Sequence, residues 1–201
     1  MLLTYDHLGR LKILLWLVVI LSCIFLLVPI IFIVPLSFGS SKWLAFPPPG
    51  WTLRWYQALI DDPRWLTASY TSFKIGILVT VASVLLGLMA SLAIIRGRFP
   101  GRNLLRGLFL TPMVLPVVVF AVATYLLFLR VGLGGTLTGF IIAHTVLAFP
   151  YAFITISNSL ENFDKSIEDA AILCGAPPYV AFLKITIPSI RLGLFLSLIH
   201  I

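Results

Sequence analysis

The sequence predicts an all-α, polytopic transmembrane helix bundle, and three observations support this fold class. The 201-residue chain is 60% hydrophobic and only 10% charged, whereas soluble domains are about a quarter charged. Its apolar residues form long uncharged runs, and a helix needs about 20 such residues to cross a bilayer. Its basic residues form short clusters between these runs, as the positive-inside rule expects. The net charge of +7 therefore reflects membrane topology, and nucleic acid is not expected as a partner.

The apolar runs predict four complete spans and the beginning of a fifth. The complete spans cover residues 13–36, 75–95, 108–129 and 137–156, and the fifth run covers residues 192–201. This last run is too short to cross the hydrocarbon core as a helix, and a terminal carboxylate at mid-depth would be costly. We therefore expect the chain to be truncated within its fifth span. Pro112 and Pro116 are expected to kink the third span.

These runs divide the chain into three segments. Residues 1–37 form an N-terminal transmembrane helix, residues 38–69 a periplasmic loop, and residues 70–201 a transmembrane domain. A cytoplasmic N-terminus puts most Lys and Arg residues on the inner side, including the arginine cluster at 96–106. The outer loop contains four of the five tryptophans, which favours an aromatic belt at the membrane surface and leaves contact with an outer partner open.

The second and fourth spans contain small and ionisable residues. Ser83, Gly87 and Ser91 recur every four residues of the second span and predict close helix packing. His144 lies in the fourth span. It is a candidate pore residue, but a neutral histidine bonded to a neighbouring helix is the preferred interpretation. The two cysteines predict neither a disulfide framework nor a metal site.

A polar loop at residues 161–188 interrupts the apolar sequence. Asp164 or Ser166 can cap a first helix, and Ser166 with Asp169 fits a capping box. Gly175 is suited to the left-handed end of this helix, and Pro177 to the first turn of the next. Pro188 is expected to begin the following break. An apolar stripe with i, i+3, i+4, i+7 spacing is formed by Ile167, Ala170, Ala171 and Cys174.

This loop resembles the E-A-A signature of permease subunits of ATP-binding-cassette importers. That signature is Glu-Ala-Ala, three residues, Gly, nine residues, then Ile-x-Leu-Pro. The chain has Asp169-Ala170-Ala171, then Gly175, then Ile185-Thr186-Ile187-Pro188 at the same separations. Asp replaces Glu, although Glu168 precedes it, and Ile187 replaces Leu. The resemblance implies that an ATPase-coupling loop contains Glu168, Asp169, Ala170, Ala171, Gly175, Ile185 and Pro188.

An amphipathic helix lying on the bilayer is the alternative interpretation of the loop. It explains the apolar stripe but not the positions of Gly175 and of residues 185–188. The resemblance further implies a type I importer permease with six spans in a bacterial inner membrane. Its implied partners are an ATPase subunit dimer, a second permease subunit, a periplasmic substrate-binding protein and membrane lipid. The chain itself would then be no enzyme and hold no cofactor, because ATP is used by the partner subunit.

Two further segments extend the resemblance to a class of solute. Residues 47–56, Pro-Pro-Pro-Gly-Trp-Thr-Leu-Arg-Trp-Tyr, and the pair Pro150-Tyr151 resemble permeases of the spermidine/putrescine type. They imply a polyamine as substrate, with iron or sulfate as alternatives. An ion-coupled secondary transporter is a rival hypothesis, but it would need intramembrane charged groups, and only His144 is available. A structural assembly subunit is a third.

Overall fold

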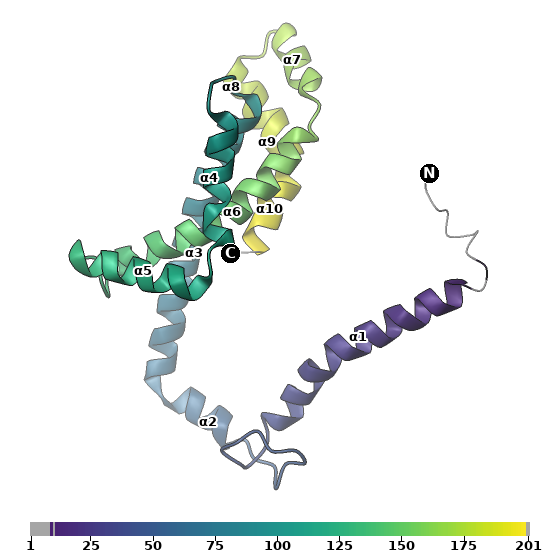
Figure 1. Cartoon of the computed structure of the whole chain (residues 1–201), viewed down its shortest axis with the longest axis vertical. Coiled ribbons are helices and arrows are strands. Elements are labelled where there is room, and N and C mark those ends of the chain that lie inside the picture. Colours follow the sequence, from purple (N-terminus) through teal and green to yellow (C-terminus); the bar gives the residue numbers. More distant parts are fainter. Residues whose placement is uncertain (1–8, 10, 200–201) are drawn as a thin grey trace. The chain divides into compact units, whose positions relative to one another are not determined.

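Helices account for most of the chain in the computed structural model, which describes residue 9 and residues 11–199 (Figure 1). This confirms the predicted all-α fold class. The chain separates into two compact units, one ending at Ala68 and the other beginning at Ser69. Parts of the sequence prediction lie outside the described residues, namely residues 1–8 and Arg10 of the predicted 1–37 segment and the end of the fifth run at 200–201.

Helix α1 (Leu11–Leu36) contains the whole first predicted span. All of its residues are described, and none of them is buried. It carries Pro29 and Pro35 in its last turns. A helix that is apolar on every side and exposed on every side is suited to a hydrocarbon environment.

The predicted outer loop folds back on itself. Gly39 and Trp51 form an isolated antiparallel bridge, and the indole N–H of Trp55 donates to the Gly39 carbonyl oxygen at 2.8 Å. Trp55 belongs to helix α2 (Arg54–Asp61), so this bond ties the helix to the start of the loop. The rings of Trp43 and Trp51 remain exposed.

Helices α3 (Pro63–Arg96) and α6 (Leu137–Glu161) contain the second and fourth predicted spans. They pack closely, because a Cβ atom built on Gly87 would lie 2.9 Å from the Cβ atom of Ala152. Ser91 donates to the Phe153 carbonyl oxygen at 3.1 Å and accepts from Ser157 at 3.0 Å. Ser83, Gly87 and Ser91 are all buried, which confirms the predicted packing role of this small-residue row.

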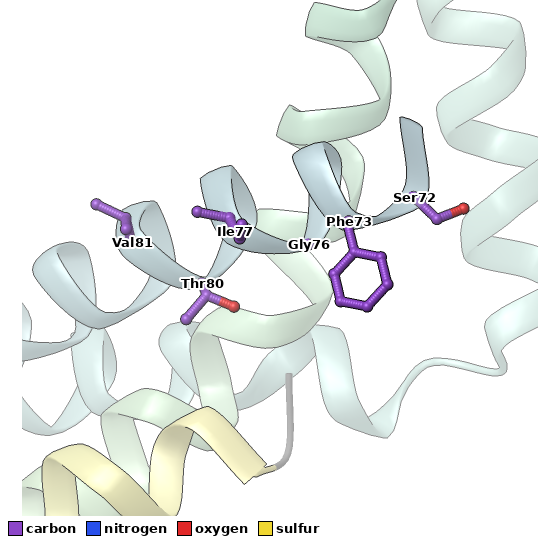
Figure 2. A pocket seen from close by; sticks show the side chains of 6 residues that line it. All are labelled: Ser72, Phe73, Gly76, Ile77, Thr80 and Val81. Carbon is purple, nitrogen blue, oxygen red and sulfur yellow. The ribbon is translucent and has the colours of Figure 1, made fainter. Parts of the chain in front are cut away.

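The same helix has an open face nearer its start. A shallow hollow of about 440 Å³ is lined there by residues of α3 alone, namely Ser72, Phe73, Gly76, Ile77, Thr80 and Val81 (Figure 2). A Cβ atom built on Gly76 would meet no neighbouring atom within 4 Å. Glycine therefore serves close packing at Gly87 and not at Gly76.

The span predicted at 108–129 is sharply bent. The structure has helix α4 (Arg102–Val114) and helix α5 (Val117–Arg130), which differ in direction by 100°. Of the two prolines expected to kink this span, Pro112 lies inside α4, and the bend occurs at Pro116. Leu115 at the break is extended, with ψ 138°. Pro116 disfavours helical geometry in the residue before it and offers no N–H to continue the helix.

The 161–188 loop is followed by helix α10 (Arg191–Ile199), which packs against α6 (Figure 1). Ile190 joins Ala152, Ile156 and Leu160 of α6 in one buried apolar cluster. Among the described residues, α1, α3 and α6 are long and apolar enough to cross a membrane, and counting each bent pair of helices as one span gives up to five. The chain is therefore multi-pass.

Candidate functional site

The first helix of the polar loop is α7 (Lys165–Leu173), and Asp164 caps it. The Asp164 carboxylate accepts the backbone N–H of Ser166 at 2.9 Å. This bond, together with one to the Ser166 side chain, holds the pKa of Asp164 below its usual range. Of the two caps left open by the sequence, the structure selects Asp164. Gly175 follows the helix with φ +95°, the left-handed conformation that its position predicted.

The second half of the loop forms three short helical pieces. These are α8 (Pro178–Ala181), the π-helix η2 (Phe182–Thr186) and α9 (Ile187–Ser189). The expectation that Pro188 begins a break was wrong, because it lies within α9 and the chain bends by 56° only after Ser189. The π-turn gives a physical reason: the Ile187 N–H bonds to the Phe182 carbonyl, which relaxes the helix just before a proline.

Glu168 is the buried polar residue of α7, with 7% of its surface exposed. Both of its carboxylate oxygens accept from Arg96 at the end of α3: Nη1 donates to Oε1 at 3.0 Å, and Nη2 donates to Oε2 at 2.7 Å. The hydroxyl of Thr186, itself fully buried in η2, also donates to Oε2. One carboxylate thus joins α3, α7 and η2. We call Arg96, Glu168 and Thr186 the buried anchor.

The surroundings of Glu168 keep it ionised. Burial alone would raise the pKa of its carboxyl group. Hydrogen bonds from Arg96 and Thr186 and the positive charges of Arg96 and Lys165 outweigh that effect, and the pKa lies below the usual value for glutamate. The anchor therefore contains a true ion pair with two parallel hydrogen bonds, the strongest geometry available to arginine and a carboxylate.

On the opposite side of α7, apolar and small side chains are exposed. Leu173 is 88% exposed and Ile167 is 53% exposed, and Ala170 and Cys174 are also exposed. We call these four residues the outward face. Asp169 is exposed beside it and lies 3.9 Å from the Lys165 ammonium group. The predicted apolar stripe is thus mostly exposed, although Ala171 is half-buried and Ile167 also lines an open hollow shared with α6 and α10.

The structure divides the predicted loop residues into groups. Asp169 and Ala170 lie on the exposed side of α7, whereas Glu168 points inward. Gly175 forms the turn, and on the second half of the loop Ile185 is half-buried and Pro188 exposed.

Sequence reasoning missed Arg96 and Thr186 as partners of Glu168. They lie 72 and 18 residues away from it in sequence, so no local spacing connects them. One signal was available: Glu168 shares a helix face with Ala171 and Ile172, at i+3 and i+4. A carboxylate on the less polar side of a short helix suggests a buried cationic partner.

His144 lies on α6 and is exposed. Its Nδ1 atom is 2.9 Å from the carbonyl oxygen of Phe140, one turn earlier in the same helix. Among the described residues this bond lies within α6, and the expected bond to a neighbouring helix stays a prediction. The imidazole contributes to the lining of a cavity of about 340 Å³ between α5 and α6, together with aromatic residues such as Tyr125 and Phe128.

Known proteins resemble this chain over most of its length. It is 35% identical over 181 residues to the putrescine transport system permease protein PotI of Escherichia coli (strain K12), covering 86% of this chain and 64% of that protein. It is 27% identical over 164 residues to the spermidine/putrescine transport system permease protein PotC of the same strain, covering 82% and 62%. It is 32% identical over 139 residues to the trehalose transport system permease protein SugB of Mycobacterium tuberculosis (strain CDC 1551 / Oshkosh), covering 69% and 51%.

The chain thus spans less than two thirds of the length of each of these relatives. Residues 83–200 also match the family described as the binding-protein-dependent transport system inner membrane component. That region includes the last part of α3, all of α6, the whole polar loop and α10. With its apolar helices, this chain is a multi-pass inner-membrane protein, and it belongs to the family of binding-protein-dependent transport system inner membrane components.

Proposed function

We propose that this chain is the membrane-spanning permease subunit of an ATP-driven importer and that α7 is the helix that docks on the ATPase. The observation that carries this proposal is the orientation of α7. The buried anchor holds Glu168 inward, and the outward face presents Ile167, Ala170, Leu173 and Cys174 to a partner. Exposed apolar patches with polar edges are typical of protein–protein interfaces.

In this function, the N-terminus and the 161–188 loop are cytoplasmic. A periplasmic binding protein delivers the solute, which passes between this chain and a second permease subunit. ATP is bound by the partner ATPase dimer. When that dimer closes, it displaces α7 and thereby shifts the equilibrium between inward-open and outward-open states.

A polyamine is the proposed solute. The support comes from the relatives named for putrescine and spermidine/putrescine transport, which match over more than four fifths of this chain. A relative named for trehalose transport matches a shorter part. Another small solute, such as iron or sulfate, is therefore the alternative, and uptake assays with labelled putrescine, sulfate and iron distinguish them.

Crosslinking tests the docking role. The full-length gene is expressed with its ATPase and permease partners, both native cysteines are replaced, and a single cysteine is placed at Ala170 on the outward face. A nucleotide-sensitive crosslink to the ATPase is expected. Leu44→Cys is the matched control, because Leu44 is 79% exposed but lies on the predicted outer loop. An assembled complex that crosslinks equally from both sites, or from neither, contradicts the proposal.

A further inference from the structure

We infer that Glu168 is a positioning residue that fixes α7 directly to the end of α3, so that a movement of α7 is delivered to α3 through the buried anchor. This inference rests on the proposed function, and it names the span that receives the movement. It also assigns different roles to two neighbouring residues of α7. Asp169 lies on the docking side, whereas Glu168 transmits the movement of α7 to α3.

The geometry of the Arg96–Glu168 pair is suited to transmission. Arg96 is the last residue of α3, and its guanidinium group donates two parallel hydrogen bonds, at 3.0 and 2.7 Å, to one carboxylate. Two such bonds fix the relative angle of the groups as well as their distance. Only 26% of the Arg96 side chain and 9% of the Glu168 side chain are exposed, so competition from water is limited.

Chain connectivity alone would not couple these helices. Helix α7 follows α6 in sequence and leads into α8, whereas α3 ends 72 residues before Glu168. The ion pair between Arg106 and Glu161, at 3.2 Å, joins α4 to α6 and does not involve α7; both of its side chains are also more than 40% exposed. The buried anchor is therefore the stronger and more direct link from the docking helix to a span.

Thr186 adds a third segment to this link. Its side chain is fully buried in the π-turn η2, and its hydroxyl donates to the carboxylate of Glu168. The helical pieces that contain it lead directly into α10, which packs on α6. A displacement of α7 thus acts on α3 through Arg96 and on the approach to α10 through Thr186.

The test compares uptake per ATP hydrolysed in proteoliposomes containing the complete transporter with full-length chains. Glu168→Gln and Arg96→Gln are expected to lower this ratio on the order of 10-fold, within the usual range of coupling between sites. Crosslinking from Ala170→Cys to the ATPase is expected to persist in both variants. Arg106→Gln is the matched control, because it breaks the exposed ion pair with Glu161, which does not involve α7, and is expected to leave the ratio unchanged.

A charge exchange separates transmission from a general structural role. The double variant Arg96→Glu with Glu168→Arg restores the pair in reverse and is expected to recover the ratio several-fold over either single charge reversal. Spin labels at Ala93→Cys on α3 and Leu173→Cys on α7 give a second readout. The distance distribution is expected to be narrow in the otherwise unaltered chain and broad in Glu168→Gln.

Two results would overturn the inference while leaving the proposed function intact. One is a normal ratio of uptake to ATP hydrolysis in both Glu168→Gln and Arg96→Gln, with the Ala170 crosslink retained. The other is a distance distribution in Glu168→Gln as narrow as in the unaltered chain. Loss of the nucleotide-sensitive crosslink in the otherwise unaltered chain would instead contradict the proposed function itself.

Discussion

Arg96 and Glu168 form a bidentate ion pair that joins helices α3 and α7 across 72 residues of sequence. The pair turns the Glu168 side of α7 inward and leaves Leu173 and Ala170 exposed on the other side. A short polar loop between membrane spans therefore has a defined orientation. This orientation exposes an apolar surface on α7, which is the proposed docking surface.

The stability contributed by the Arg96–Glu168 pair should change with pH only under acidic conditions, below about pH 4.3. The pKa of Glu168 is lowered in the folded chain, so the unfolded chain, with a pKa of about 4.3, binds more protons as the pH falls. The contribution is present above about pH 4.3 and is lost as the pH falls through the folded pKa. The melting temperature of the purified transporter should differ between the unaltered chain and Glu168→Gln by a constant amount from about pH 8 to about pH 5. A difference that already shrinks between about pH 7 and about pH 5 would contradict this assignment.

A charge on the outward face should prevent ATPase binding. Leu173→Asp places a carboxylate in the middle of the proposed interface, where desolvating it on docking would cost on the order of 2 kcal/mol, or about 30-fold in affinity. Co-purification of the ATPase measures the effect. Tyr179→Asp, on the next helix of the loop and 68% exposed, maps how far the interface extends. Equal ATPase recovery with Leu173→Asp and with the unaltered chain would exclude the outward face.

A larger side chain should lower stability at Gly87 but have little effect at Gly76. Gly87→Val forces a branched side chain against Ala152 and should destabilise the α3–α6 contact by about 1–3 kcal/mol. Gly76→Val lies on the open face of α3, where no atom lies within 4 Å of the Cβ position, and should be nearly neutral. Melting temperatures of the two variants in detergent provide the comparison, and similar losses at both sites would argue against close packing at Gly87.

The turn after α7 should require glycine. Gly175 has φ +95°, and a Cβ atom in the left-handed region costs roughly 1–2 kcal/mol. Gly175→Ala should therefore loosen α7 and speed hydrogen exchange of its last amides. Gly107→Ala is the control, because Gly107 lies within α4 with no atom near its Cβ position. Unchanged exchange in Gly175→Ala would show that the turn relaxes without cost.

His144 should be dispensable for energy coupling. Its imidazole bonds to a carbonyl of its own helix, an arrangement that offers no partner charge for moving protons through a span. His144→Ala is expected to keep ATP-dependent uptake within about twofold, and no pH gradient should drive uptake. Loss of uptake together with a requirement for a proton gradient would favour the rival secondary transporter.

The sequence predicted those features that depend on local patterns. Ser83, Gly87 and Ser91 lie on the packing face that their spacing indicated, and Gly175 has the left-handed conformation that its place after α7 suggested. The contact between Glu168 and Arg96 could not be predicted, because no local pattern identifies a partner 72 residues away. A kink in the third span was expected from its prolines. The size of the bend at Pro116 was not expected, because the sequence remains apolar on both sides of it and so gives no sign of how sharply the chain turns.

Cysteine scanning along residues 165–174, in the assembled transporter with both native cysteines replaced, tests the central claim most directly. If α7 docks on the ATPase through its outward face, crosslinking should rise at Ile167, Ala170 and Leu173 and fall at Glu168 and Ile172, and ATP should alter the yield. Strong crosslinks at Glu168 and Ile172, or none at the outward positions of an intact complex, would contradict it.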